Sequence, residues 1–173
     1  MQCWPIRDAT IEIRNVYYNV WKQLMSSSKE HYAASREEHL AAICRQFSIS
    51  IVYAFGSRAK ETLAWLRQEI QEMRASQSDL DIGVLPIPGF HPSPREKVEL
   101  CIRLEDFFQV SRVDLVILPE APPFLASRVI QGERLYAADE YQADEYDLYV
   151  LRRAGDLMPF HRERLRLLFG EDT

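Results

Sequence analysis

Two short apolar runs interrupted by aspartate constrain the fold of this chain more than any other feature. The first occupies residues 78–85 (SDLDIGVL). Side chains alternate between the faces of a β-strand, so Asp79 and Asp81 are predicted to share one face while apolar residues share the other. Two neighbouring carboxylates repel each other, and a bound divalent cation is the usual way to offset that repulsion.

A second apolar run, at residues 113–118 (VDLVIL), carries Asp114 in a similar setting. Upstream, residues 51–55 have the composition of a strand and lead directly into Gly56 and Ser57. Three strand-borne acids, together with a Gly-Ser turn at the end of a strand, predict a site for metal ions and a nucleotide.

Composition sets the broad class of the protein. The chain has 173 residues, 47% of them apolar, which predicts one folded domain with a sizeable core. Lys and Arg total 21 against 26 Asp and Glu, a net charge of -5. That acidity argues against broad binding to a nucleic-acid backbone, and we expect no direct nucleic-acid partner. It leaves room for a small cationic pocket that binds one nucleotide.

The cysteines and the chain termini carry little functional signal. Cys44 and Cys101 fall within apolar helical patterns and are predicted to be core residues. The three cysteines have neither the spacing of a disulfide framework nor that of a zinc site. Charged residues interrupt the N-terminal segment, and no stretch is long and apolar enough to span a bilayer. We therefore expect a cytoplasmic protein without membrane contact.

The order of predicted elements indicates an α+β (or α/β) fold with a small mixed sheet flanked by helices. Residues 1–34 are interpreted as an N-terminal extension of unknown role, with a short amphipathic helix around residues 16–24, and residues 35–173 as one domain with a helical C-terminal tail. Helices are expected at 36–47, 59–76, 94–108, 124–131 and 140–169, the last broken near Pro159, and strands at 49–55, 80–85, 113–118 and 133–137.

The three acids are suited to in-line phosphoryl or nucleotidyl transfer. Two divalent ions can stabilise both the attacking and the leaving oxygen of such a reaction, provided that carboxylates on rigid strands hold them. Asp79 and Asp81 would bridge the ions. Asp114 would complete the site and could accept the proton of the attacking group.

The turn after the strand at 49–55 is suited to a triphosphate. Backbone amides at Gly56 and Ser57 and the dipole of the following helix favour phosphate, and glycine permits close approach of the backbone. Arg58 and Lys60 lie close enough in sequence to add positive charge.

Each of these features also has a simpler interpretation. A Gly-Ser pair after a strand is often only a turn, and Asp-x-Asp is often a solvated strand face or a local turn. Asp114 can pair structurally with Arg112 or with another cation. Their occurrence together, in this order and on these elements, favours a catalytic site.

With these motifs the sequence resembles the nucleotidyltransferase superfamily that has a DNA polymerase β-type palm. The matching segments are 55–59 (FGSRA), 78–81 (SDLD) and 113–116 (VDLV). More narrowly, the chain is similar to the minimal nucleotidyltransferases, the antitoxins of gene pairs whose toxin is a HEPN-domain ribonuclease. The tail carries this narrower resemblance, through residues 121–136 (APPFLASRVIQGERLY) and the aromatic, acid-rich helix that follows.

The resemblance implies an activity, a partner and a set of site residues. It implies transfer of AMP from ATP, with Mg²⁺ (two ions), to a tyrosine of a HEPN toxin, and therefore a hetero-oligomer with that toxin. The expected site has three acids that bind metal and take part in catalysis, and a nucleotide-binding turn: Asp79, Asp81 and Asp114, and Gly56, Ser57 and Arg58.

The chain departs from the family pattern between the turn and the acids. The gap between Gly-Ser and Asp-x-Asp is roughly twice the usual one, and Glu61 stands where the family commonly has glycine. We expect a lengthened helix or a helical hairpin within residues 61–77. Two other functions fit the same motifs: a catalytically degenerate antitoxin that acts by binding alone, and a small-molecule adenylyltransferase of the aminoglycoside type.

Overall fold

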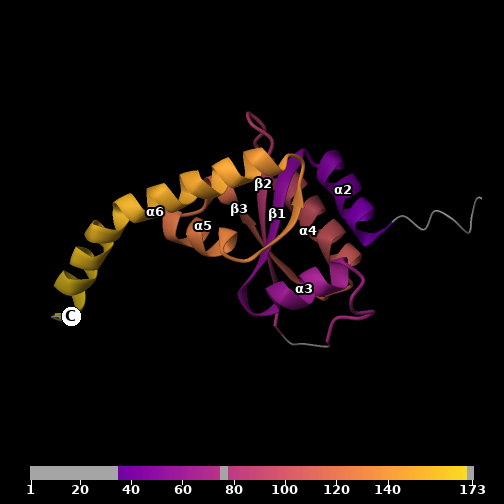
Figure 1. Ribbon diagram of the computed structural model, residues 1–173, viewed down its shortest axis with the longest axis horizontal. Coiled ribbons are helices and arrows are strands. Elements are labelled where there is room, and N and C mark those ends of the chain that lie inside the picture. The colour runs from indigo at the N-terminus through magenta and orange to yellow at the C-terminus, as the bar shows by residue number, and fades with distance from the viewer. Residues whose placement is uncertain (1–34, 75–77, 171–173) are drawn as a thin grey trace, which may run out of the picture. The chain divides into compact units, whose positions relative to one another are not determined.

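The computed structural model describes residues 35–74 and 78–170, so the extension and helix expected within residues 1–34 lie outside the described residues (Figure 1). From Arg36 onward the described residues form one compact unit. Its helices are α2 (Arg36–Gln46), α3 (Ala59–Leu66), α4 (Pro94–Phe108), α5 (Pro123–Ile130) and α6 (Glu140–Phe169), and its strands are β1 (Ile49–Phe55), β2 (Leu80–Pro86), β3 (Val113–Ile117) and β4 (Glu133–Ala137). Short 3-10 helices follow β1, at Gly56–Arg58, and β3, at Leu118–Glu120.

The four strands form one mixed sheet in the order β3-β2-β1-β4. Strand β1 is antiparallel to both β2 and β4, whereas β2 and β3 are parallel. The expected α+β fold with a small mixed sheet is therefore confirmed, and β4 is an edge strand as predicted. The register places Phe55 of β1 opposite Asp81 of β2, and Asp81 opposite Asp114 of β3.

Helices cover both faces of the sheet (Figure 1). On one face Val52, Ala54 and Ile82 are among the apolar strand residues that pack against α2, α3 and α4. On the opposite face Tyr53 packs against α5 and α6. Helix α5 lies directly on β2, because a Cβ atom at Gly83 would come within 2.2 Å of Cγ1 of Val129. Glycine at this strand position allows that close approach.

The helix after the Gly-Ser turn is shorter than expected. Helix α3 ends at Leu66, whereas the composition favoured helix to about residue 76. The guanidinium of Arg36 lies 4.1 Å from the centre of the Trp65 ring and donates hydrogen bonds to the carbonyls of Ile70 and Gln71, each at 2.9 Å. The segment therefore turns back against α2, because a distant side chain binds its carbonyls.

Helix α6 is continuous, so the break expected at Pro159 is wrong. Figure 1 shows α6 as one curved helix that extends past α5. A proline inside a helix removes one backbone donor and bends the helix axis. The helical hydrogen bonds on either side of Pro159 suffice to continue the helix. Asp139 begins the helix, since its side chain accepts a hydrogen bond from the backbone N–H of Gln142 at 3.0 Å.

The first turns of α6 are attached to the sheet by a cluster of charges. Arg134 on β4 forms ion pairs with Glu140 and Asp144, both at 2.7 Å, and with Asp147 at 2.9 Å. The hydroxyl of Tyr53 on β1 donates a hydrogen bond of 2.6 Å to Asp147. Two strands thus hold the start of the C-terminal helix.

Helix α4 begins as predicted, because Ser93 forms a capping box with Glu96. The spacing of apolar residues predicts an apolar side made of Val98, Cys101, Ile102, Leu104 and Phe108, and the structure buries only part of this set. Leu104 is buried, but Val98 and Ile102 are 59% and 50% exposed. The buried residues are Leu100, Leu104 and Phe108, which are spaced four apart and face the sheet. Val98 and Ile102 lie on another side of the helix.

The remaining structural expectations concern cysteine and the membrane. Cys44 is buried, as predicted, and burial raises the pKa of its thiol to about 12. Cys101 is half-buried. Within residues 35–74 and 78–170, no helix is long and apolar enough to cross a membrane.

Candidate active site

The structure brings two of the three predicted acids together. Asp81 on β2 and Asp114 on β3 occupy the same register position of parallel neighbouring strands. Ile82 and Val113 contribute to the core on one side of the sheet, so these acids project to the other side, which α5 covers further along β2. Asp81 is half-buried and Asp114 is exposed to solvent.

The third acid lies beside them but outside the strand. Asp79 immediately precedes β2, and its carboxylate forms an ion pair with Nε of Arg112 at 3.3 Å. The sequence left open that Arg112 pairs with Asp114; in the structure Arg112 pairs with Asp79. Asp79 thus lies one residue before the strand, whereas the alternation predicted that it shares a strand face with Asp81.

The expected repulsion among the acids is visible at Asp81. The pKa of its carboxyl is raised, first by partial burial, then by the charges of Asp114 and Asp79, while the charge of Arg128 opposes the shift. Partial burial of a carboxylate beside two others disfavours its charged form. A cation placed among these groups would therefore stabilise their ionised forms.

The predicted Gly-Ser turn abuts the acids. Gly56 follows β1 with φ of 72°, in the left-handed region that favours glycine. A Cβ atom there would lie 2.3 Å from Oδ2 of Asp81. Glycine is therefore required both for the backbone conformation and for the approach of Asp81. Ser57 is exposed, and the chain passes from this turn into α3.

A cavity of about 420 Å³ opens at this turn. It is lined by residues of two regions of the chain, the β1–α3 turn and the α5–β4 turn: Phe55, Gly56, Ser57, Ala59, Lys60, Arg128, Gln131, Gly132 and Glu133. The two turns meet because Gly132 has no side chain; a Cβ there would come within 2.2 Å of the carbonyl oxygen of Ala54.

Sequence reasoning found only the first half of this cavity. The apolar periodicity of residues 124–131 predicted a helix with Gly132 as its cap, and nothing local signals that Arg128 faces the Gly-Ser turn. Its one pattern in the sequence, a basic residue shortly before a glycine after the strand that carries Asp114, does not indicate which element the side chain faces. The spatial proximity comes from α5 packing on Gly83.

Arg58, expected to contact the nucleotide, has other partners. Its side chain is 8% exposed and is not among the residues that line the cavity. It donates to the carbonyls of Ser78 and Arg74, both at 3.3 Å, and pairs with Glu61 at 3.3 Å. Glu61 in turn accepts a hydrogen bond from the backbone N–H of Arg74. Arg58 thus anchors the inserted segment.

The three acids have the chemistry of a magnesium site but not its arrangement. Carboxylates are the ligands that Mg²⁺ prefers, and the mutual repulsion at Asp81 suits a cation. In the part of the chain that the structure describes, however, no group of three acidic, histidine or cysteine side chains is close enough to hold a metal ion. Asp81 and Asp114 share one register position and are suited to the ion by residue type, whereas the carboxylate of Asp79 is paired with Arg112 and would have to leave it to join them.

The fold and the acid pair define the class of protein. Residues 38–141 match the family described as polymerase beta, nucleotidyltransferase. The chain belongs to this nucleotidyltransferase family. The matched residues include the Gly-Ser turn and all three acids. A search of curated proteins found no match.

Solved structures of toxin–antitoxin complexes contain chains with the same fold. One, a toxin–antitoxin with AMP-PNP, is 19% identical, with a TM-score of 0.59, over 76% of this chain and 97% of that chain. A second, a tri-AMPylated Shewanella oneidensis HEPN toxin in complex with an MNT antitoxin, is 18% identical, with a TM-score of 0.56, over 77% and 95%. A third, the MntA–HepT toxin–antitoxin, is 18% identical, with a TM-score of 0.56, over 77% of this chain and 96% of that chain. At these identities the likeness establishes the fold.

Proposed function

We propose that this protein is a magnesium-dependent adenylyltransferase that modifies a tyrosine of a HEPN ribonuclease toxin and thereby acts as an antitoxin. The observation that carries the proposal is the register of Asp81 with Asp114, with Gly56 directly against Asp81. This arrangement sets a phosphate-binding turn beside two carboxylates at one edge of the cavity.

The proposed reaction is the transfer of AMP from ATP to a tyrosine oxygen. The tyrosine oxygen attacks the α-phosphorus of ATP, the bond from that phosphorus to the oxygen bridging the β-phosphate breaks, and pyrophosphate leaves with both electrons of that bond. The tyrosine proton passes to Asp114, whose exposed carboxylate is open to an incoming side chain. Mg²⁺, held by Asp81, Asp114 and a released Asp79, would offset the negative charge of the phosphates.

The choice of a toxin as acceptor rests on the resemblance and on the fold of the solved relatives. Chains with this fold were crystallised as toxin–antitoxin complexes, and one such complex holds an AMPylated HEPN toxin. By analogy we expect a cytoplasmic hetero-oligomer with a HEPN toxin encoded by an adjacent reading frame. The acidic net charge of -5 agrees with a protein, rather than a nucleic acid, as the acceptor.

The test is transfer of label from α-labelled ATP to the toxin in the presence of Mg²⁺. We expect label on the toxin with the wild type and at least a hundred-fold less with Asp81→Asn or Asp114→Asn, since each removes a carboxylate next to the reacting phosphate. Asp106→Asn, an exposed acid on α4, is the matched control and should retain full activity. Absence of label with the wild type at every metal concentration would exclude catalysis on the toxin.

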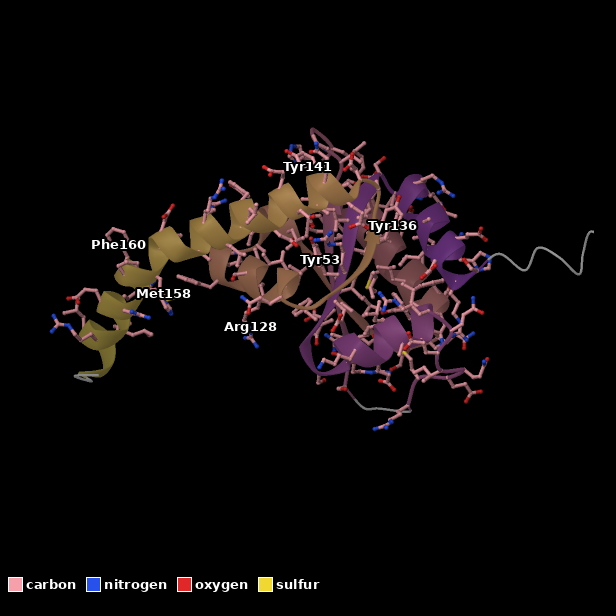
Figure 2. All side chains as sticks on the ribbon, viewed as in Figure 1. Tyr53, Arg128, Tyr136, Tyr141, Met158 and Phe160 are labelled. Atoms are coloured by element: carbon pink, nitrogen blue, oxygen red, sulfur yellow. The ribbon has the colours of Figure 1, made fainter. Side chains whose placement is uncertain are left out.

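A second candidate function is neutralisation by binding alone, and the end of α6 favours it. Phe160, Leu167 and Leu168 are 73%, 73% and 63% exposed, and Figure 2 shows Phe160 and Met158 on the part of α6 that extends past α5. Exposed apolar side chains in this number are typical of protein interfaces. If a variant with all three acids changed to Asn still protects cells from the toxin, binding suffices.

A further inference from the structure

Arg128 is a cation that lines the cavity at the Gly-Ser turn. It lies on α5, is exposed, and points away from α6 (Figure 2). Among the residues that the structure describes, its guanidinium has no hydrogen-bonded or ion-paired partner within the protein. A free guanidinium at the wall of a cavity is available to an anionic ligand.

The cavity holds a second cation on a separate element. Lys60 comes from the first turn of α3, next to Gly56 and Ser57, whereas Arg128 comes from the last turn of α5. Glu133 is the one acid among the lining residues, so the lining has a formal charge of +1. Two basic side chains from different elements, with a glycine-containing turn between them, form a receptor for a multiply charged phosphate group.

The position of this cavity relative to the acids gives the orientation of the ligand. Gly56 lines the cavity and also contacts Asp81, which places the acid pair at the cavity's edge. The phosphate that reacts must lie near Asp81 and Asp114. The other phosphates of the triphosphate then extend into the cavity, where Lys60 and Arg128 lie.

Arg58 is excluded from this role by its surroundings. Its side chain is almost fully buried and its guanidinium is already occupied by two backbone carbonyls and by Glu61. To reach a nucleotide it would have to abandon all three contacts. Arg128 would have to abandon none.

We propose that Arg128, together with Lys60, binds the β- and γ-phosphates of the nucleoside triphosphate and so selects a triphosphate over a monophosphate. The inference rests on the proposed nucleotidyl transfer and specifies how the leaving group is recognised. In that reaction the β- and γ-phosphates depart as pyrophosphate, so Arg128 also stabilises the charge that develops on the leaving oxygen.

Calorimetric titration of the full chain with AMP-PNP and with AMP, in Mg²⁺ at constant ionic strength, tests this. Arg128→Gln should raise the Kd for AMP-PNP about ten- to hundred-fold, as expected for loss of a charge-assisted contact, and should change the Kd for AMP less than about three-fold. The Kd of Arg128→Lys for AMP-PNP should lie between those of the wild type and Arg128→Gln, because lysine keeps the charge but lacks the planar guanidinium. Arg103→Gln, an exposed arginine on α4, is the matched control and should leave both Kd values unchanged.

The outcomes separate this inference from the proposed function. Equal AMP-PNP affinity for the wild type and Arg128→Gln would overturn the role of Arg128 while leaving nucleotide binding intact. Equal losses for AMP-PNP and AMP would also overturn it, since Arg128 would then contact the nucleoside or the α-phosphate. No binding by the wild type would instead contradict the proposed function. Unchanged urea midpoints establish that each variant is folded.

Discussion

The carboxylate of Asp79 lies 3.3 Å from Nε of Arg112, in the segment that leads into the strand carrying Asp114. The carboxylate of one predicted metal ligand is therefore already engaged by a cation of the protein. The side chain of Arg112 is 70% exposed and that of Asp79 39%, so water screens the attraction. Exposed pairs contribute about 0.2–1 kcal/mol, a contribution that a divalent cation can readily exceed.

Release of Asp79 should favour metal binding. In the Arg112→Ala variant, we expect the Mg²⁺ concentration that gives half-maximal AMP transfer to fall roughly two- to five-fold, because metal no longer competes with the guanidinium. The measurement is activity against free Mg²⁺ at saturating ATP. Arg103→Ala is the control for loss of a surface charge. A requirement for more Mg²⁺ in Arg112→Ala would show that Arg112 assists the site.

Neutralising Asp81 should stabilise the metal-free protein. Burial and the charges of Asp114 and Asp79 raise the pKa of Asp81 in the folded state. A raised carboxyl pKa means that stability falls as pH rises from the unfolded pKa through the folded pKa. We therefore expect Asp81→Asn to melt above the wild type at pH 7 in EDTA, with the difference shrinking as pH falls through that range.

Calorimetric Tm values from pH 3 to pH 8 measure this effect. Asp106→Asn removes an exposed acid of α4 and should give no comparable pH-dependent gain. A wild type that melts above Asp81→Asn at pH 7 would mean that Asp81 makes a net favourable contact in the empty site.

Two glycines allow the cost of backbone conformation to be separated from the cost of crowding Asp81. Gly56 and Gly89 have φ of 72° and 82°, yet a Cβ at Gly89 meets nothing within 4 Å, whereas one at Gly56 meets Asp81. We expect Gly89→Ala to lower the free energy of unfolding by about 1 kcal/mol and Gly56→Ala by about 2–3 kcal/mol. Urea denaturation measures both.

Nucleotide binding should separate the same two variants. Gly89→Ala should retain AMP-PNP affinity, while Gly56→Ala should lose it because Asp81 and the turn are displaced. Equal stability losses with equal affinities in the two variants would show that the contact between Gly56 and Asp81 relaxes without consequence.

The Arg58–Glu61 pair is expected to act on stability and not on nucleotide binding. Arg58→Met leaves Glu61 and two backbone carbonyls without their partner in a largely buried position, at a cost of about 3 kcal/mol in unfolding free energy. Under conditions where the variant is folded, its AMP-PNP Kd should equal that of the wild type. Unchanged stability with weakened AMP-PNP binding would instead restore Arg58 to the nucleotide site.

Much of the fold follows from local patterns in the chain. Alternation of apolar and acidic residues predicts β2 and β3 and which side chains of each strand share a face, because side-chain direction in a strand has a period of two. The parallel pairing of the two strands then brings Asp81 and Asp114 together. Ser93 and Glu96 predict the start of α4 by a capping box. The Gly-Ser pair predicts the turn at Gly56, where a positive φ excludes most other residues.

Contacts between distant residues decided the rest. Arg36 binds the carbonyls of Ile70 and Gln71, more than thirty positions away, and so holds the segment that follows α3. Helix α6 continues through Pro159 because the loss of one backbone bond does not end a helix of 30 residues. Glu61 and the long segment after it, two separate departures in the sequence, are one feature in space, since Glu61 and Arg58 together hold Arg74.

The acids, the glycine of the turn and the mixed α+β architecture were determined by the sequence alone, because each depends on residue type and on spacing within one element. Which basic residue lines the cavity at the Gly-Ser turn was decided only by the tertiary structure. Arg58 is adjacent to the turn in sequence but is directed into the protein. Arg128 is far from it in sequence and reaches the cavity because α5 packs on Gly83 and Gly132 lets β4 approach β1.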